Sequence, residues 1–314
     1  DNWAIKGVAY ANRDRGTHII TTAIEHHAVL HTCEYLERQG FTVTYLPVDR
    51  FGRVDPADVA GAITDETVLV SVMAANNEIG TVEPIAAIGA IAKEHGIPFH
   101  CDAVQAIGHL PIDVDALSVD LLSLSGHKFY GPKGTGALYI RKGTRIDTFM
   151  HGGGQEAGRR AGTENLPGIV GLGAAIERAC TDIDAHAARL AALRDRLIEG
   201  LVREIPGTYL NGHPNDRLPG NANCSFAAVD GEALLYLLDA EGICCSTGSA
   251  CSSGSESPSH VLAACGIDPV LARASLRFTL GDATTPEDIE TVIAAVADAV
   301  RRLRALSPLG AHYS

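Results

Sequence analysis

Apolar residues recur along this chain in two patterns that alternate through its first half. Short β-branched or apolar runs, which predict strands, occupy residues 17–24, 41–48, 67–75, 97–103, 120–126 and 134–140. Stretches with helical spacing, which predict helices, occupy residues 2–7, 26–40, 56–63 and 84–96. Strands that alternate with helices in this way predict a mainly parallel sheet with helices on its faces.

The pattern changes in the second half of the chain. Helical spacing runs from residue 168 to residue 205 and predicts one long helical stretch. Beyond it, the pattern predicts two shorter strands and two final helices, at residues 221–227, 275–281, 232–240 and 286–305. Because 314 residues exceed one simple core, we predict a large domain at residues 1–185 and a smaller α+β domain at residues 186–314.

Composition is that of an ordinary globular protein, with 46% hydrophobic and 20% charged residues. The formal net charge of −13 disfavours direct binding to nucleic acids or anionic membranes, whose phosphates would be repelled. No run of 18 apolar residues and no signal-peptide pattern is found, so we expect no membrane span. The eight cysteines form no C-x-x-C pair, and we expect reduced thiols, no bound metal and a cytoplasmic location.

Polar side chains follow four of the predicted strands. His26 comes after the first strand, Asn77 after the third, Asp102 and Gln105 at the end of the fourth, and Lys128 after the fifth. Taken singly, an aspartate at a strand end is more often a helix cap than a catalytic group. In a parallel sheet, however, the carboxyl ends of the strands meet at the edge where ligands bind. We therefore expect these groups to converge on one site.

Lys128 is the most informative of these residues. It follows an apolar strand and is flanked by glycines in SLSGHKFYGPKGTGAL (123–138), where desolvation would lower the pKa of its amine. A partly deprotonated lysine can form a Schiff base with a carbonyl group. The alternative from this window alone is a surface lysine in a β-turn.

One cofactor requires this set of groups. Pyridoxal phosphate (PLP) needs a Schiff-base lysine, a carboxylate facing its pyridine nitrogen, a donor for its phenolate oxygen and a flat group against its ring. Lys128, Asp102, Gln105 and His26 would fill these roles in that order.

Seven motifs stand in the order that is found in cysteine desulfurases of the NifS/IscS type, which are PLP enzymes of fold type I. They are EHHAVL (25–30), NNEIGT (76–81), DAVQAIG (102–108), SGHKFYGPKG (125–134), HGGGQEAGRRAGT (151–163), STGSACSSGSESPSHVL (246–262) and LRFTLG (276–281). The resemblance covers essentially the whole chain. It implies a PLP cofactor, an α/β large domain and a smaller C-terminal domain that carries a catalytic cysteine.

The resemblance also implies roles for further residues. Ser125 and His127 would contact the cofactor phosphate, and Asn77 would lie beside the phenolate oxygen and the substrate. Arg277 would hold the substrate carboxylate. Thr163 would reach the phosphate of the neighbouring subunit in a homodimer.

Cys251 decides which reaction is expected. It lies in a Ser/Gly-rich stretch without hydrophobic period, which is typical of a loop that exposes a thiol. Together with the resemblance, it predicts conversion of L-cysteine to L-alanine and a persulfide on Cys251. Iron–sulfur scaffold proteins or tRNA-thiolation carriers would accept the sulfur. His26 is expected to transfer protons to or from the substrate as well as to stack on the ring.

The other cysteines are expected to pack rather than react. Cys244 and Cys245 end an apolar segment and are predicted to be core residues. Packing is also predicted for cysteines on apparent strands or helices, namely Cys33, Cys101, Cys180 and Cys265. A metal site made of Cys224, Cys244, Cys245 and Cys251 is disfavoured because the C-x₂₋₄-C spacing is missing.

The start of the chain departs from the family pattern. It opens at Asp1-Asn2 in a helical pattern, whereas family members carry a Gly-Thr-Glu-type phosphate loop just before such a pair. We therefore expect an N-terminal segment to precede this numbering.

Two alternatives stay open at this stage. Another fold-type I enzyme, such as a selenocysteine lyase or an aminotransferase, would keep Lys128 and Asp102 but would not need Cys251. An inactive docking subunit of a sulfur-transfer complex would lack the phosphate loop.

Overall fold

The computed structural model describes residues 1–247 and 259–306. The chain divides into two compact units. The first consists of Asp1–Val48, Arg53–Asn76 and Glu83–Ile183. The second consists of Asp49–Gly52, Asn77–Val82 and the residues from Asp184 onward. Two short segments from the first half of the chain thus belong to the second unit.

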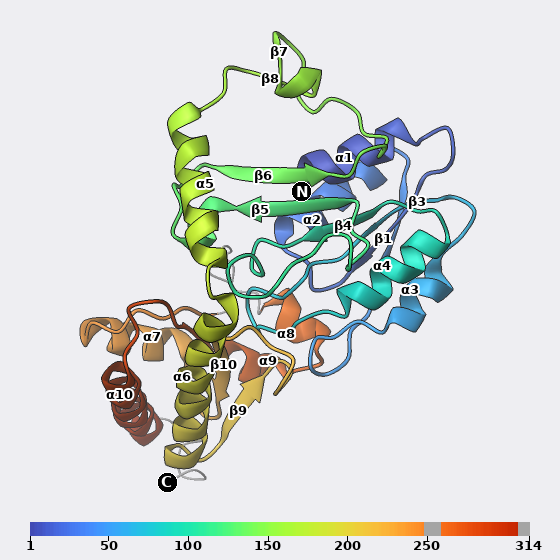
Figure 1. Ribbon diagram of the computed structural model, residues 1–314. Helices are drawn as coiled ribbons and strands as arrows, with labels where there is room; N and C mark the ends of the chain where they lie inside the picture. The colour runs from blue at the N-terminus through green and yellow to red at the C-terminus, as the bar shows by residue number, and fades with distance from the viewer. Residues whose placement is uncertain (248–258, 307–314) are drawn as a thin grey trace. The chain divides into compact units, whose positions relative to one another are not determined.

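The first unit is built on one six-stranded sheet with the strand order β2-β1-β3-β4-β5-β6 (Figure 1). Its strands are β1 (His18–Thr22), β2 (Thr42–Leu46), β3 (Thr67–Ser71), β4 (Phe99–Asp102), β5 (Leu121–Ser125) and β6 (Gly136–Ile140). Neighbouring strands are parallel except for β6, which runs antiparallel to β5. The mainly parallel α/β sheet that was predicted from the sequence is confirmed.

Helices cover both faces of this sheet. They are α1 (Asn2–Ala11), α2 (His27–Glu37), α3 (Pro56–Ala62), α4 (Ile85–Glu94) and α5 (Leu166–Cys180). Successive residues of β3 point to opposite faces, so Leu69 packs with α1 and α2 while Val70 packs in the cluster that contains Ile88 of α4. Each face thereby buries its own apolar core, which explains why the strands read as continuous apolar runs.

A short antiparallel arm projects from the first unit between β6 and α5 (Figure 1). It contains β7 (Gly154–Gln155), a 3₁₀ turn (Glu156–Gly158) and β8 (Arg160–Ala161). Most of its residues are exposed, among them Thr163 just beyond β8. The arm therefore has almost no core of its own.

The second unit is an α+β structure. Its antiparallel sheet has the order β11-β10-β9, from β9 (Thr208–Asn211), β10 (Asn221–Phe226) and β11 (Ser275–Thr279). Its helices are α6 (Ile183–Glu204), α7 (Gly231–Ala240), α8 (His260–Ala264), α9 (Pro269–Arg273) and α10 (Pro286–Leu306). Leu197, Phe226, Leu276 and Val296 are fully or almost fully buried in its core. In the described residues, no helix is long and apolar enough to cross a membrane.

The structure corrects several details of the sequence-based prediction. The stretch 168–205 is two helices, because Thr181 is extended and Asp182 has a left-handed φ of 52°. Cys180 and Cys244 were expected to pack, but both are exposed. Helical spacing continues across the break in 168–205, so the apolar pattern alone does not reveal it. The strand β9 was not predicted, since TYLN is short and ends on a polar residue.

Candidate cofactor and substrate sites

Lys128 lies in a tight 3₁₀ turn (Gly126–Phe129) that follows β5 directly. The turn closes through a hydrogen bond of 2.8 Å from the Gly131 N–H to the Gly126 carbonyl. A Cβ at Gly126 would come within 2.9 Å of both Leu172 and Thr135, so a larger residue there would have to displace these side chains. This packing fixes the backbone that carries Lys128, whose side chain is half-buried.

Asp102 is the last residue of β4 and is buried, with 5% exposure. Its Oδ1 accepts a hydrogen bond of 2.9 Å from the Val104 N–H. Burial raises the pKa of the Asp102 carboxyl, while the Val104 N–H and the charge of Lys128 act in the opposite direction. Among the described residues, none donates a hydrogen bond to Oδ2. A buried carboxylate with one uncommitted oxygen fits a protonated pyridine nitrogen.

His26 occupies the N-cap position of α2. Its Nδ1 accepts a hydrogen bond of 3.2 Å from the Ala28 N–H, so the neutral ring carries its proton on Nε2. The side chain is half-buried and follows β1 at the carboxyl edge of the sheet. His26 is therefore both a structural cap and an oriented Nε2–H donor.

Further polar groups stand at the same edge of the sheet. Gln105 is half-buried in the turn that follows Asp102. At the end of β5, the Oγ of Ser125 lies 2.8 Å from the Nδ1 of His127. The first unit thus brings six of the predicted groups to the ends of β1, β4 and β5. These groups could hold the ring and phosphate of PLP.

Arg277 and Asn77 belong to the second unit. Arg277 lies on β11, where its main chain pairs with Asn223 of β10 on one side and with Ser246 on the other. Its Nη1 donates a hydrogen bond of 3.0 Å to the Asn77 carbonyl. Its Nε is buried and has no hydrogen-bond partner among residues 1–247 and 259–306. A guanidinium that is anchored on one side and unsatisfied on the other suits a carboxylate ligand.

The two remaining predicted residues are Cys251 and Thr163. Cys251 lies in 248–258, outside the described residues. Thr163 is exposed near the arm and forms no hydrogen bond or ion pair with another described residue.

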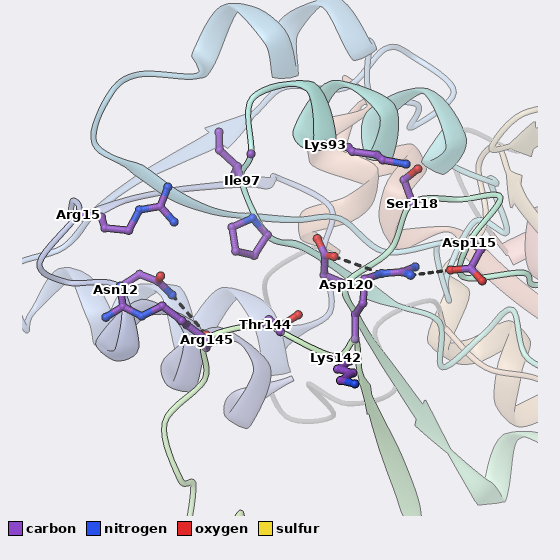
Figure 2. Close-up of a pocket in the computed structure, with 14 residues that line it drawn as sticks. Asn12, Arg15, Lys93, Ile97, Asp115, Ser118, Asp120, Lys142, Thr144 and Arg145 are labelled. Carbon is purple, nitrogen blue, oxygen red and sulfur yellow. Dashed lines mark hydrogen bonds and ion pairs between the residues drawn. The ribbon is translucent and has the colours of Figure 1, made fainter.

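A pocket of about 570 Å³ lies at the opposite edge of the sheet (Figure 2). It is lined by Ile97, which precedes β4, by Asp120, which precedes β5, and by Arg141, which follows β6. Arg141 forms ion pairs with Asp115 and Asp120, at 2.5 Å and 3.3 Å, and Figure 2 labels both of these carboxylates. Because these positions mark the amino ends of the parallel strands, this pocket is separate from the groups around Asp102 and Lys128.

Sequence reasoning assigned no role to two buried polar residues. His100 on β4 is fully buried and bonded to serines on both neighbouring strands. Glu78 accepts a hydrogen bond from Ser259. Their only sequence signal is a polar residue inside or directly after an apolar run, which does not identify the partners.

Residues 1–292 match the aminotransferase class-V family. The chain belongs to this family. Its members use PLP, so the cofactor that the residues at the sheet edge predicted is confirmed, as is the resemblance to cysteine desulfurases.

Relatives at high identity share one name. The chain is 62% identical over 309 residues to a cysteine desulfurase IscS of Methanosarcina thermophila, covering 98% of this chain and 76% of the relative. It is 57% identical over 316 residues to a cysteine desulfurase IscS of Clostridium botulinum (strain Hall), covering 100% of this chain and 79% of the relative.

Solved structures agree with these relatives. A NifS-like protein has a TM-score of 0.87 at 39% identity, covering 95% of this chain and 78% of that one. A structure described as SspA in complex with cysteine has a TM-score of 0.77 at 40% identity, covering 89% and 78%.

Proposed function

We propose that this chain is a cysteine desulfurase that converts L-cysteine to L-alanine and retains the sulfur on Cys251. The observation that carries the proposal is 62% identity over 98% of the chain to a desulfurase, in a chain that keeps Lys128, Asp102 and Cys251. Identity at this level over 98% of the chain favours a desulfurase over an aminotransferase or an inactive docking subunit.

The first unit would hold PLP, which when bound supplies an electron sink for charge at the substrate carbon atoms. Asp102 would accept a hydrogen bond from the pyridine nitrogen through Oδ2, and His26 would lie against the ring. Lys128 would hold the cofactor through Nζ. The same amine is the proposed base for the Cα proton, since the turn at Gly126 fixes its position.

Arg277 would bind the substrate carboxylate. Its Nη1 is already committed to the Asn77 carbonyl, so the unsatisfied Nε would take up the new hydrogen bond. Backbone pairing with Asn223 and Ser246 holds the strand that carries Arg277 in place. Binding energy is therefore gained with little reorganisation.

Sulfur transfer is the step assigned to Cys251. Its thiolate would form an S–S bond with the substrate sulfur while the Cβ–S bond breaks and the electron pair stays with the carbon. Protonation of that carbon gives the methyl group of alanine, and the sulfur stays on the enzyme as a persulfide. His26, whose Nε2 carries a proton, would deliver protons in this reaction.

Dimer formation is supported by the exposure of α5. Only Gly168 is buried in this 15-residue helix, while Leu166, Ile169 and Val170 are 66%, 45% and 70% exposed. Apolar side chains gathered on one element mark an interaction surface. A second copy of the chain is the proposed occupant, with Thr163 reaching the cofactor phosphate of the partner.

The sulfur acceptor would be an iron–sulfur scaffold protein or a tRNA-thiolation carrier in the cytoplasm. This part of the proposal rests on the family resemblance and on the reduced state expected for all the cysteines.

The proposal is tested by Cys251→Ala, with Cys244→Ala as the matched control because Cys244 is an exposed neighbour in sequence. Cys251→Ala should keep the visible absorption of bound PLP and its change on adding L-cysteine. Alanine production should fall at least about 100-fold, since no nucleophile is left to accept the sulfur. Cys244→Ala should turn over like the unmodified enzyme. Normal alanine production by Cys251→Ala would overturn the proposal.

A further inference from the structure

His100 lies in the centre of the first unit's sheet. It is the second residue of β4 and its side chain has no exposed surface. Its Nδ1 is 2.8 Å from the Ser71 hydroxyl on β3, and its Nε2 is 2.8 Å from the Ser123 hydroxyl on β5. One side chain therefore joins three adjacent strands by hydrogen bonds that are independent of the backbone ladder.

The position of this link relative to the cofactor groups is defined by the strand register. Ser71 pairs with His100, and Ser123 pairs with Asp102. His100 and Asp102 are two residues apart on one strand, so they point to the same face. Ser123 lies on the strand that leads to Lys128. The His100 link therefore stands next to Asp102 and ties its strand to the one that presents Lys128.

The chemical state of His100 suits a fixed link. Burial lowers the pKa of its imidazole well below the usual value, so the ring is neutral. A neutral ring donates through one nitrogen and accepts through the other. The Asp1 carboxylate oxygen Oδ1 lies 3.7 Å from Nε2, which favours the proton on Nε2. Ser71 then donates to Nδ1, and Nε2 donates to Ser123.

A second buried histidine forms a similar link away from the proposed cofactor groups. His18 is the first residue of β1, and it lies 2.8 Å from the hydroxyls of Thr44 on β2 and Thr67 on β3. It also joins three strands, but at the amino edge of the sheet. Only His100 stands beside a proposed cofactor residue. The first unit thus contains two such links, one at the amino edge of the sheet and one beside Asp102.

We infer that His100 is a positioning residue for PLP: with Ser123 it holds the Asp102 carboxylate in place relative to Lys128. This inference rests on the proposed cofactor roles of Asp102 and Lys128. A charged hydrogen bond between carboxylate and ring nitrogen requires heavy atoms within about 2.7–2.9 Å. The backbone ladder between β4 and β5 is short, with three register pairs, so it leaves room for a side-chain link to add rigidity. A side-chain link beside Asp102 limits relative movement of these two strands.

The experiment measures the PLP dissociation constant and the urea midpoint of four variants of the full chain. His100→Phe removes both bonds and should weaken PLP binding by about tenfold, the lower end of what lost supporting contacts cost a bound metal. His100→Gln places an amide near the position of Nε2 and should restore most of the affinity. His100→Asn places an amide near Nδ1 and reaches only Ser71, so it should not restore the PLP affinity. His18→Phe should lower the urea midpoint and leave PLP affinity unchanged.

The outcomes separate the inference from general effects on stability. Equal losses of PLP affinity in His18→Phe and His100→Phe would overturn it, as would equal behaviour of the Gln and Asn variants. If His100→Phe does not fold, Ser123→Ala and Ser71→Ala give the same comparison. Ser123→Ala should weaken PLP binding and Ser71→Ala should not, and equal effects would overturn the inference. Asp102→Asn with unchanged PLP affinity and absorption would instead refute the proposed cofactor site itself.

Discussion

The Ser259 hydroxyl donates a hydrogen bond of 2.5 Å to the Glu78 carboxylate, across 181 positions of sequence. Both side chains are buried, with 6% and 4% exposure. Ser259 also caps α8, because its Oγ accepts hydrogen bonds from the Val261 and Leu262 N–H groups. It is the first described residue after 248–258, so Glu78 fixes the point at which the chain returns from that segment.

Glu78→Ala should destabilise the second unit by about 1–3 kcal/mol, because the buried Ser259 hydroxyl loses its acceptor. Glu78→Gln keeps an acceptor oxygen and should cost less than half as much. Urea unfolding measures both values. Equal destabilisation by the two variants would contradict the hydrogen bond as the cause and point to loss of the carboxylate charge, which both variants share.

Arg277→Lys should raise the KM for L-cysteine by about tenfold or more while the PLP content stays constant. Lysine keeps the positive charge but lacks the planar fork that bonds Asn77 and a carboxylate at the same time. Steady-state kinetics and absorption measure the two quantities. Arg273→Lys, an exposed position on α9, is the control and should leave KM unchanged. A normal KM in Arg277→Lys would remove this residue from substrate binding.

Val170→Glu should dissociate the proposed homodimer, because a charge would be buried where α5 meets its copy. Val270→Glu is the matched control, since Val270 on α9 is 60% exposed but stands outside α5 and the arm. Sedimentation at micromolar concentration should give a monomer for the first variant and a dimer for the second. A monomeric and fully active unmodified enzyme would refute the dimer proposal.

Stability should fall as the pH falls from 7 to 5. Burial lowers the pKa of both His18 and His100, so the unfolded chain takes up protons that the folded chain does not. The loss begins as the pH falls through about 6.5, the usual histidine value, and continues towards the lowered folded pKa. Urea midpoints at several pH values measure the slope. In His100→Gln the slope should be shallower, and an unchanged slope would exclude His100 as a source.

The central strands of the first unit's sheet were predictable because they are buried on both faces. All five residues of β1 and of β3 are buried, and such continuous apolar runs stand out from their surroundings. The break between α5 and α6 was not predictable, since two polar residues in a long helical pattern do not reveal a left-handed φ at Asp182.

The residues of the candidate site also differ in how far the sequence predicts them. Asp102 and His26 follow from topology alone, because polar residues at parallel strand ends share one edge. The role of Arg277 came only from the family resemblance, since nothing near it in the sequence indicates the Asn77 carbonyl that orients it. The His100 link was invisible, because its partners lie 29 and 23 residues away on other strands.

The assignment of residues 77–82 to the second unit limits how far this protein is modular. Arg217 is 5% exposed and donates to the Ile79 carbonyl, and burial lowers its pKa to about 10. The Asn221 and Asn223 amides both donate to the Glu78 carbonyl. A fragment that begins at Asp184 would lack these acceptor carbonyls, although Arg217 keeps the carbonyls of Asn211, His213 and Asn221. The C-terminal unit is therefore not a cassette that a single cut at Asp184 would release, because it also includes Asp49–Gly52 and Asn77–Val82 from the first half of the chain.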